Sequence, residues 1–126
     1  MRLIDTSAWV EWLTGSPTAR KLQGKMPARP EWLVPTIVQL ELAKWLTREA
    51  GEDEADTVIA FTQTCLIADL DTRIAVSAAA LSVLYKLATA DAIIYATAVA
   101  FGAELVTCDK HFAGLPSVTY IAKARV

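Results

Sequence analysis

Short apolar segments alternate with helical patterns along the whole chain, and this alternation limits the possible folds more than any other feature. Segments of the first kind read as strands, at residues 2–5, 32–34, 65–68, 104–107 and 118–122. Helical segments lie between them, at 7–13, 16–25, 36–50, 52–63, 71–87 and 91–101. The alternation predicts an α/β fold, a parallel sheet of about five short strands with helices on both faces.

The length and composition fit one domain. The chain has 126 residues, of which 54% are apolar, enough for a well-filled core and too many for a disordered chain. No internal repeat, linker or low-complexity segment interrupts the sequence. We therefore predict a single domain over residues 1–126.

Residue types at the helix ends suggest where several helices begin and stop. Thr36 and Gln39 have the spacing of a capping box. Ser16 precedes a proline and predicts a helix start, and Thr89 is a candidate cap for the last long helix. Gly51 follows the helix 36–50 and is expected to end it.

Acidic residues occur where a parallel sheet would gather them. Asp5 closes the first strand and Asp109 follows the strand 104–107, so both lie at the carboxyl ends of strands. Asp91 opens a helix, and Glu41 lies one turn into the helix that follows the second strand. A helix of about 11 residues leads roughly 16 Å away from this edge, and the following strand leads back. Acids distant in sequence are thus predicted to be neighbours.

Clustered carboxylates repel one another unless a cation lies between them. Oxygen ligands of this kind favour Mg²⁺ or Mn²⁺. Each acid also has a structural alternative: Asp5 as a helix N-cap, Asp91 as an ordinary first-turn acid, and Asp109 as a loop residue. We assign the remaining candidates to solvent, caps or strand ends: Glu11, Glu31, Asp69, Asp71 and Glu104. Asp69 or Asp71 is expected to cap the helix 71–87, although both also follow the carboxyl end of a strand.

Cysteine and histidine content argues against zinc. Cys65 and Cys108 are isolated, and the chain has one histidine, His111. We expect two free thiols in a cytoplasmic protein. The longest uncharged apolar stretches, 74–85 and 92–103, are shorter than the ~20 residues that span a bilayer, and no signal peptide is visible.

The charge balance does not favour a nucleic-acid partner overall. The formal net charge is −2, whereas phosphate binding usually requires a basic surface. Arg20, Lys21, Lys25 and Arg29 nevertheless cluster within ten residues, away from the acidic stretch 49–56. A solvated helix face is the alternative explanation for both clusters, and it fits the acidic one better than the basic one.

Several motifs together resemble PIN-domain nucleases, and in particular VapC-type toxins of toxin–antitoxin modules. The motifs are Asp5-Thr6-Ser7 after the first strand, Glu41, Ala90-Asp91-Ala92 with the helix that follows, and the segment 102–112 containing Thr107-Cys108-Asp109. The resemblance covers essentially the whole chain. It implies an Mg²⁺-dependent endoribonuclease, a toxin that forms a homodimer and is inhibited by a cognate antitoxin.

The resemblance also implies roles for individual residues. The catalytic set would be Asp5, Glu41, Asp91 and Asp109, with Mg²⁺, or Mn²⁺ in its place, held by Asp5, Asp91 and Asp109. Glu41 would bind a second ion or orient the attacking water.

Neighbouring polar residues would support these acids. Thr6, Ser7 and Thr107 have hydroxyls near the acids and are candidates to orient them. Lys110 or His111 could touch the RNA backbone.

Two readings from other classes remain open. A receiver-type phosphoacceptor domain has a similar length, sheet and acidic pocket, but normally has paired acids after its first strand, where this chain has Asp5-Thr6-Ser7. The second alternative is a non-catalytic interaction module that retains the PIN-like fold but has no nuclease activity. Trp9, Trp12 and Trp45 are expected to pack mainly in the core; alternatively, Trp9 or Trp12 forms an exposed groove for a partner's helix.

Overall fold

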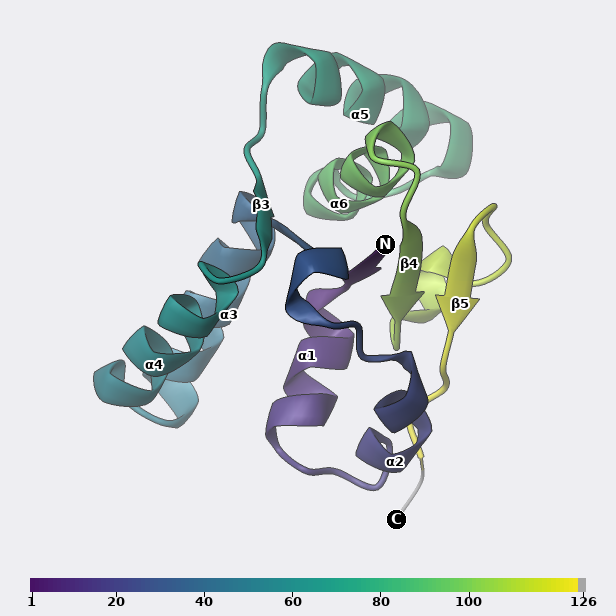
Figure 1. Cartoon of the computed structure of the whole chain (residues 1–126). Coiled ribbons are helices and arrows are strands. Elements are labelled where there is room, and N and C mark those ends of the chain that lie inside the picture. The colour runs from purple at the N-terminus through teal and green to yellow at the C-terminus, as the bar shows by residue number, and fades with distance from the viewer. Residues whose placement is uncertain (125–126) are drawn as a thin grey trace.

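A five-stranded parallel sheet forms the centre of the computed structural model, which describes residues 1–124 (Figure 1). The strand order is β3-β2-β1-β4-β5, and every neighbouring pair is parallel. The strands are β1 (Arg2–Ile4), β2 (Trp32–Pro35), β3 (Leu66–Ala68), β4 (Glu104–Thr107) and β5 (Val118–Tyr120). The predicted α/β class and parallel sheet are confirmed.

Helices fill every connection except the last, which contains one short 3₁₀ turn. The α-helices are α1 (Thr6–Leu13), α2 (Ala19–Leu22), α3 (Thr36–Glu49), α4 (Glu52–Thr62), α5 (Thr72–Tyr85) and α6 (Thr89–Ala100). The 3₁₀ turns are η1 (Gln23–Lys25), η2 (Arg29–Glu31) and η3 (Lys110–Phe112). In Figure 1, α5 and α6 lie together at one end of the molecule, and α3 and α4 pack side by side at another.

Both faces of the sheet are covered. Successive side chains of a strand point to opposite faces, yet all residues of β2 are buried, from Trp32 to Pro35. Helices α1 and α6 both contact β4, and α6 also contacts β2. This double coverage explains why the central strands are mainly apolar, whereas the edge strands β3 and β5 are less buried.

The strand order reverses between β1 and β4. The chain moves outward from β1 through β2 to β3, then returns across the sheet to pair β4 with the other side of β1. Open α/β sheets bind ligands at such a switch point, outside the carboxyl ends of the strands. Receiver-type domains have the order 2-1-3-4-5 instead, so the receiver alternative is wrong.

Several helix ends follow the sequence signals. Gly51 has a φ of 97°, which an L-residue adopts only with strain, and it separates α3 from α4. Asp71 caps α5, because its Oδ1 accepts a hydrogen bond from the Ile74 amide at 2.9 Å. The assignment of Asp71 to a cap is confirmed.

The predicted capping box at the start of α3 is wrong. Pro35 leaves the strand in an extended conformation and occupies the N-cap position, so Thr36 is already helical. Gln39 donates instead to the Thr62 hydroxyl on α4 at 3.0 Å, a contact that the sequence pattern cannot reveal.

Two other predicted helix starts also differ. The helix expected from Ser16 begins only at Ala19 and ends at Leu22, after which the chain tightens into η1. Ala88, rather than Thr89, is the N-cap of α6.

Trp9 belongs to the core, and its alternative role in an exposed groove is wrong. Its side chain is 1% exposed, and its ring centroid lies 4.7 Å from that of Trp32. Trp12 and Trp45 are partly buried against the same core. Among the described residues, no single helix is long and apolar enough to cross a membrane; α5 and α6 pass that test only together, with a bend of 113° between them.

Candidate functional site

The switch point between β1 and β4 brings the predicted acids together. Asp5 follows β1, and its amide donates to the Val106 carbonyl of β4 at 2.9 Å. Asp109 lies two residues beyond the end of β4, on the same edge. The N-termini of α3 and α6 face this edge, so Glu41 and Asp91 approach it from the helices.

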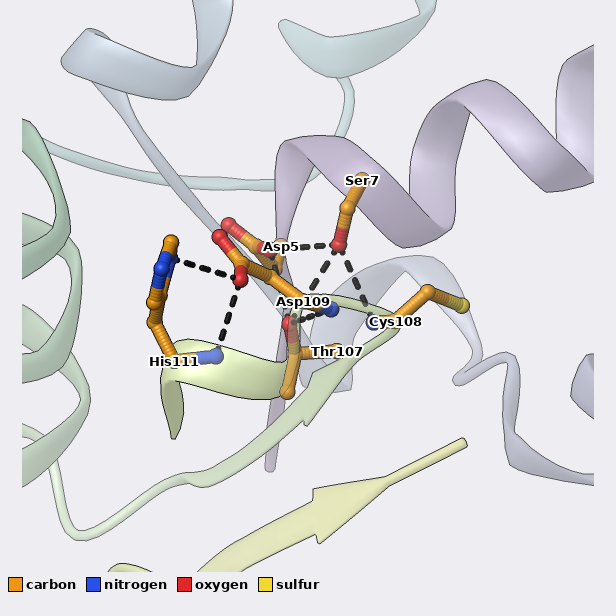
Figure 2. A network of polar contacts seen from close by, with 6 residues as sticks. All are labelled: Asp5, Ser7, Thr107, Cys108, Asp109 and His111. Atoms are coloured by element: carbon orange, nitrogen blue, oxygen red, sulfur yellow. Dashed lines mark hydrogen bonds and ion pairs between the residues drawn. The ribbon is translucent and has the colours of Figure 1, made fainter. Parts of the chain in front are cut away.

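Two hydroxyl groups fix the carboxylate of Asp5 (Figure 2). Asp5 Oδ2 accepts hydrogen bonds from Ser7 Oγ at 2.6 Å and from Thr107 Oγ1 at 2.8 Å. Asp5 stands at the N-cap position of α1, but within the described residues its side chain makes no capping hydrogen bond. The capping alternative for Asp5 is therefore wrong, and its carboxylate faces the other acids.

The same hydroxyls also hold the loop that carries Asp109. The Cys108 amide donates to Ser7 Oγ at 3.0 Å, and the Asp109 amide donates to Thr107 Oγ1 at 2.9 Å. Each hydroxyl therefore accepts from the β4 loop and directs its own proton to Asp5. This relay couples β1, α1 and the β4 loop, as Figure 2 shows.

Asp109 organises the turn that follows it. Its Oδ1 accepts from the His111 amide at 2.9 Å and lies 3.0 Å from His111 Nδ1. Ligand atoms of Asp91, Asp109 and His111 all lie within 4.8 Å of one another. The group therefore brings Asp91 of α6 close to Asp109 and His111, which follow β4.

Glu41 borders the site on the α3 side. Its Oε1 accepts a hydrogen bond from Thr6 Oγ1 at 2.6 Å. Thr6 precedes Ser7 on α1, so neighbouring hydroxyls orient two different carboxylates, Glu41 and Asp5. All three hydroxyl residues named from the sequence thus lie in the site: Thr6, Ser7 and Thr107.

The acids lie close enough to perturb one another. Burial, and then the negative charges of Asp109, Asp5 and Glu41, raise the pKa of Asp91 to about 6, against the smaller opposing effect of His111. Burial also raises the pKa of Asp5, which is 4% exposed, although the hydrogen bonds from Ser7 and Thr107 lower it in part. A cluster of carboxylates with raised pKa values is typical of a functional site.

The donor set fits a hard divalent cation. Both hydrogen bonds to Asp5 end on Oδ2, so within the described residues Oδ1 remains free to bind an ion. Asp91 and Asp109 add further carboxylate oxygens, the ligand type that Mg²⁺ and Mn²⁺ prefer. A bound cation would relieve the repulsion that raises the pKa of Asp91.

Two neighbours of the acids, His111 and Cys108, make contacts that the sequence did not reveal. His111, which was expected only as a possible contact to the RNA backbone, has its Nδ1 within 3.0 Å of Asp109 Oδ1. The Cys108 thiol is free, as predicted, but the Cys108 amide also donates a hydrogen bond to Ser7 Oγ. The available signal was an acid, Asp109, two residues after the end of a strand, where a loop turns back over the sheet edge.

Comparison with known proteins gives a consistent result. The PIN domain family model matches residues 2–117, whereas comparison with curated proteins finds no match. A toxin–antitoxin complex from Klebsiella pneumoniae contains a chain that is 27% identical, with a TM-score of 0.83, over 98% of this chain and 100% of that chain.

More distant solved structures share the fold. VapC20 from Mycobacterium tuberculosis, a toxin that cleaves the sarcin–ricin loop, has 19% identity and a TM-score of 0.74 over 92% of this chain and 95% of that one. DNA-bound VapBC from Salmonella typhimurium has 17% identity and a TM-score of 0.72 over 95% and 97% of the respective chains. The resemblance to VapC-type toxins is confirmed, and the chain belongs to the PIN domain family.

Proposed function

We propose that this protein is the toxin of a toxin–antitoxin pair and that it hydrolyses RNA phosphodiester bonds with the help of Mg²⁺. The observation that carries this proposal is the convergence of acids at the switch point of the sheet: Asp91 and Asp109 have ligand atoms within 4.8 Å of each other, and the charges of Asp5 and Glu41 act on Asp91. The similarity to a toxin–antitoxin complex and to an RNA-cleaving toxin supports the same activity.

Asp5, Asp91 and Asp109 are the proposed ligands of the cation, and Mn²⁺ is a plausible substitute. When bound, the cation would stabilise negative charge on the phosphate and lower the pKa of a water molecule. His111, which lies beside Asp91 and Asp109, is a further candidate to contact the cation or the phosphate.

The remaining residues would position the reacting groups. Glu41, oriented by Thr6, would align the attacking water or contribute to a second cation site. Ser7 and Thr107 would keep the Asp5 carboxylate in one orientation and prevent it from turning away as the substrate enters.

The proposed protein partner is a cognate antitoxin. A groove of about 390 Å³ runs between α1, α3 and α4, where Leu13, Trp45 and Val58 form an apolar part of the wall and Glu49 and Glu54 an acidic part. Such a groove suits the apolar face of a helix. Trp45 lines this groove, whereas Trp9 is buried in the core.

We also propose a homodimer. Helix α5 exposes apolar side chains that the monomer leaves uncovered: Val76 is 67% exposed, Val83 82% and Leu84 66%. Exposed apolar residues that gather on one helix are typical of a subunit interface.

The direct test combines RNA cleavage with growth. The purified protein should cleave RNA in Mg²⁺ or Mn²⁺ but not in excess chelator, and its induction in bacteria should stop growth. Asp5→Asn should abolish both effects, because it removes one ligand charge and preserves the size of the side chain. Co-expression of the cognate antitoxin should restore growth.

The non-catalytic alternative makes the opposite prediction. If the wild-type protein cleaves no RNA with either metal, and if wild type and Asp5→Asn are equally harmless over a wide range of induction, the protein is an interaction module rather than a nuclease.

A further inference from the structure

A cavity of about 580 Å³ adjoins the carboxylates beside the β5 edge of the sheet. It begins at Ser7 and Asp109, which belong to the acidic site, and its outer wall includes Lys110, Tyr120 and Lys123. Its volume lies within the roughly 300–1,000 Å³ of small-ligand sites. We call it the β5 cavity.

The sheet register fixes the position of Tyr120 relative to the acids. Tyr120 pairs with Thr107 in the parallel ladder between β4 and β5, so their side chains point to the same face. The Thr107 hydroxyl binds Asp5 on that face. Tyr120 is 38% exposed and lines the cavity, so its ring is accessible to a ligand that also reaches the carboxylates.

Two lysines add positive charge to this wall. Lys110 and Lys123 are exposed, and neither forms an ion pair with another residue of the described segment 1–124. Lys123 lines the cavity together with Cys108 and Asp109. Two lysine side chains without ion-pair partners in this segment therefore lie beside the acidic site.

The backbone around Lys123 is held in place. The Ala124 amide donates to Thr18 Oγ1 at 2.8 Å, and Lys21 Nζ donates to the Ala122 carbonyl at 3.3 Å. These contacts tie the segment after β5 to the region of α2. The cavity wall is therefore part of the fold and does not need a ligand to form it.

We propose that the β5 cavity binds the nucleotide next to the scissile phosphate of single-stranded RNA, with its base on the Tyr120 ring and its phosphate beside Lys110 and Lys123. The inference rests on the proposed ribonuclease function and names where its substrate binds. Sites for single strands combine cationic side chains, which neutralise phosphates, with aromatic rings, on which bases stack. A duplex would not expose a base to Tyr120.

The charge distribution gives a physical reason for such a subsite. Carboxylates at the site repel the phosphates that flank the scissile bond, and a metal ion compensates only near itself. Lysines beside the site would offset this repulsion for the adjacent phosphate. A protein with a net charge of −2 can thus bind RNA through a local basic wall.

Binding and cleavage assays can test the subsite separately from the chemistry. Binding of a fluorescein-labelled single-stranded RNA of mixed sequence is measured by anisotropy in excess chelator, and kcat and KM are measured in Mg²⁺. The variants are Tyr120→Ala, Tyr120→Phe and the double variant Lys110→Gln/Lys123→Gln. Arg73→Gln, an exposed cation on α5, is the control for loss of charge.

We expect Tyr120→Ala to raise Kd and KM about 10-fold, the loss of one stacked base, and to change kcat less than twofold. Tyr120→Phe keeps the ring and should bind like wild type. The double lysine variant should flatten the dependence of log Kd on log salt by about 1.4, since each phosphate contact to a single strand contributes about 0.7. Arg73→Gln should change none of these values.

Several results would overturn the subsite. If wild type cleaves RNA while Tyr120→Ala and the lysine variant keep the wild-type KM and salt dependence, the subsite is wrong and the ribonuclease function stands. If wild type neither binds nor cleaves RNA, both proposals fail. If Tyr120→Ala weakens only the retention of a co-expressed antitoxin, the cavity is a protein contact. If the Tyr120→Ala variant does not fold, the salt dependence of Kd in the double lysine variant decides whether the subsite exists.

Discussion

Replacement of Asp91 by asparagine should stabilise the metal-free protein while it abolishes cleavage. The pKa of Asp91 is raised from 3.8 to about 6, so the folded protein binds a proton on Asp91 more tightly than the unfolded chain does. As pH rises from about 4 to about 6, the folded state therefore loses stability. Above about pH 6 the ionised Asp91 exerts its full destabilising effect, which asparagine removes.

The magnitude follows from three contributions. A shift of about two pKa units corresponds to about 3 kcal/mol, and we take about half of this because Asp91 is partly exposed and solvent screens its charge. Asp91 also lies in the first turn of α6, where a negative charge is favourable by about 0.3–1 kcal/mol. The net gain should be about 1 kcal/mol at pH 8, or roughly 3–5 °C in Tm.

The assay is thermal unfolding at pH 4 and pH 8 in excess chelator, together with RNA cleavage in Mg²⁺. Asp91→Asn should melt above wild type at pH 8 and within about 1 °C of it at pH 4, where wild-type Asp91 is already protonated. Added Mg²⁺ should raise the Tm of wild type more than that of the variant, because ligand binding stabilises the folded state.

Asp53→Asn is a matched control. Asp53 lies in the first turn of α4, is exposed, and is remote from the acid cluster. The substitution should therefore cost up to about 1 kcal/mol at pH 8 and leave cleavage intact. If Asp91→Asn is also less stable than wild type at pH 8, or cleaves RNA normally, then Asp91 is an ordinary helix acid and our reasoning about the cluster is wrong.

Two further predictions concern the hydrogen-bond relay and assembly. Thr107→Val removes the donor to Asp5 and the acceptor of the Asp109 amide, so it should reduce cleavage about 10–100-fold; Thr107→Ser should recover most of the activity, and equal loss in both variants would contradict the role of the hydroxyl. Sedimentation at tens of micromolar, a rough working concentration, should detect a homodimer that Leu84→Asp dissociates. A monomeric wild type, or an unchanged Leu84→Asp dimer, would refute the α5 interface.

Local features of the fold were readable from the sequence because they depend on nearby residues. Short apolar runs predicted the strands, since both faces of the sheet are buried and no polar alternation is needed. Asp71 and Gly51 marked helix ends correctly, because a cap acts over three or four residues. The Thr36–Gln39 pattern failed because Pro35 occupies the N-cap position, and because Gln39 donates instead to a distant residue, Thr62.

The acids were predicted as a set, but the sequence did not reveal how they meet. Parallel strands explain why Asp5 and Asp109 share an edge, whereas only the order β2-β1-β4 makes them neighbours. The orientation of Asp5 depends on Thr107, which is 102 positions away and comes within hydrogen-bond distance only through the pairing of β1 with β4.

The β5 cavity illustrates what tertiary structure alone decides. Lys110, Tyr120 and Lys123 form no motif in sequence, and a shift of one residue in the β4–β5 register would turn Tyr120 to the opposite face. The sequence by itself determined the strands, the helices and the identity of the acids, because local propensity and polarity encode them. Which of these residues share one site was decided by strand order and register, because those depend on how the whole core packs.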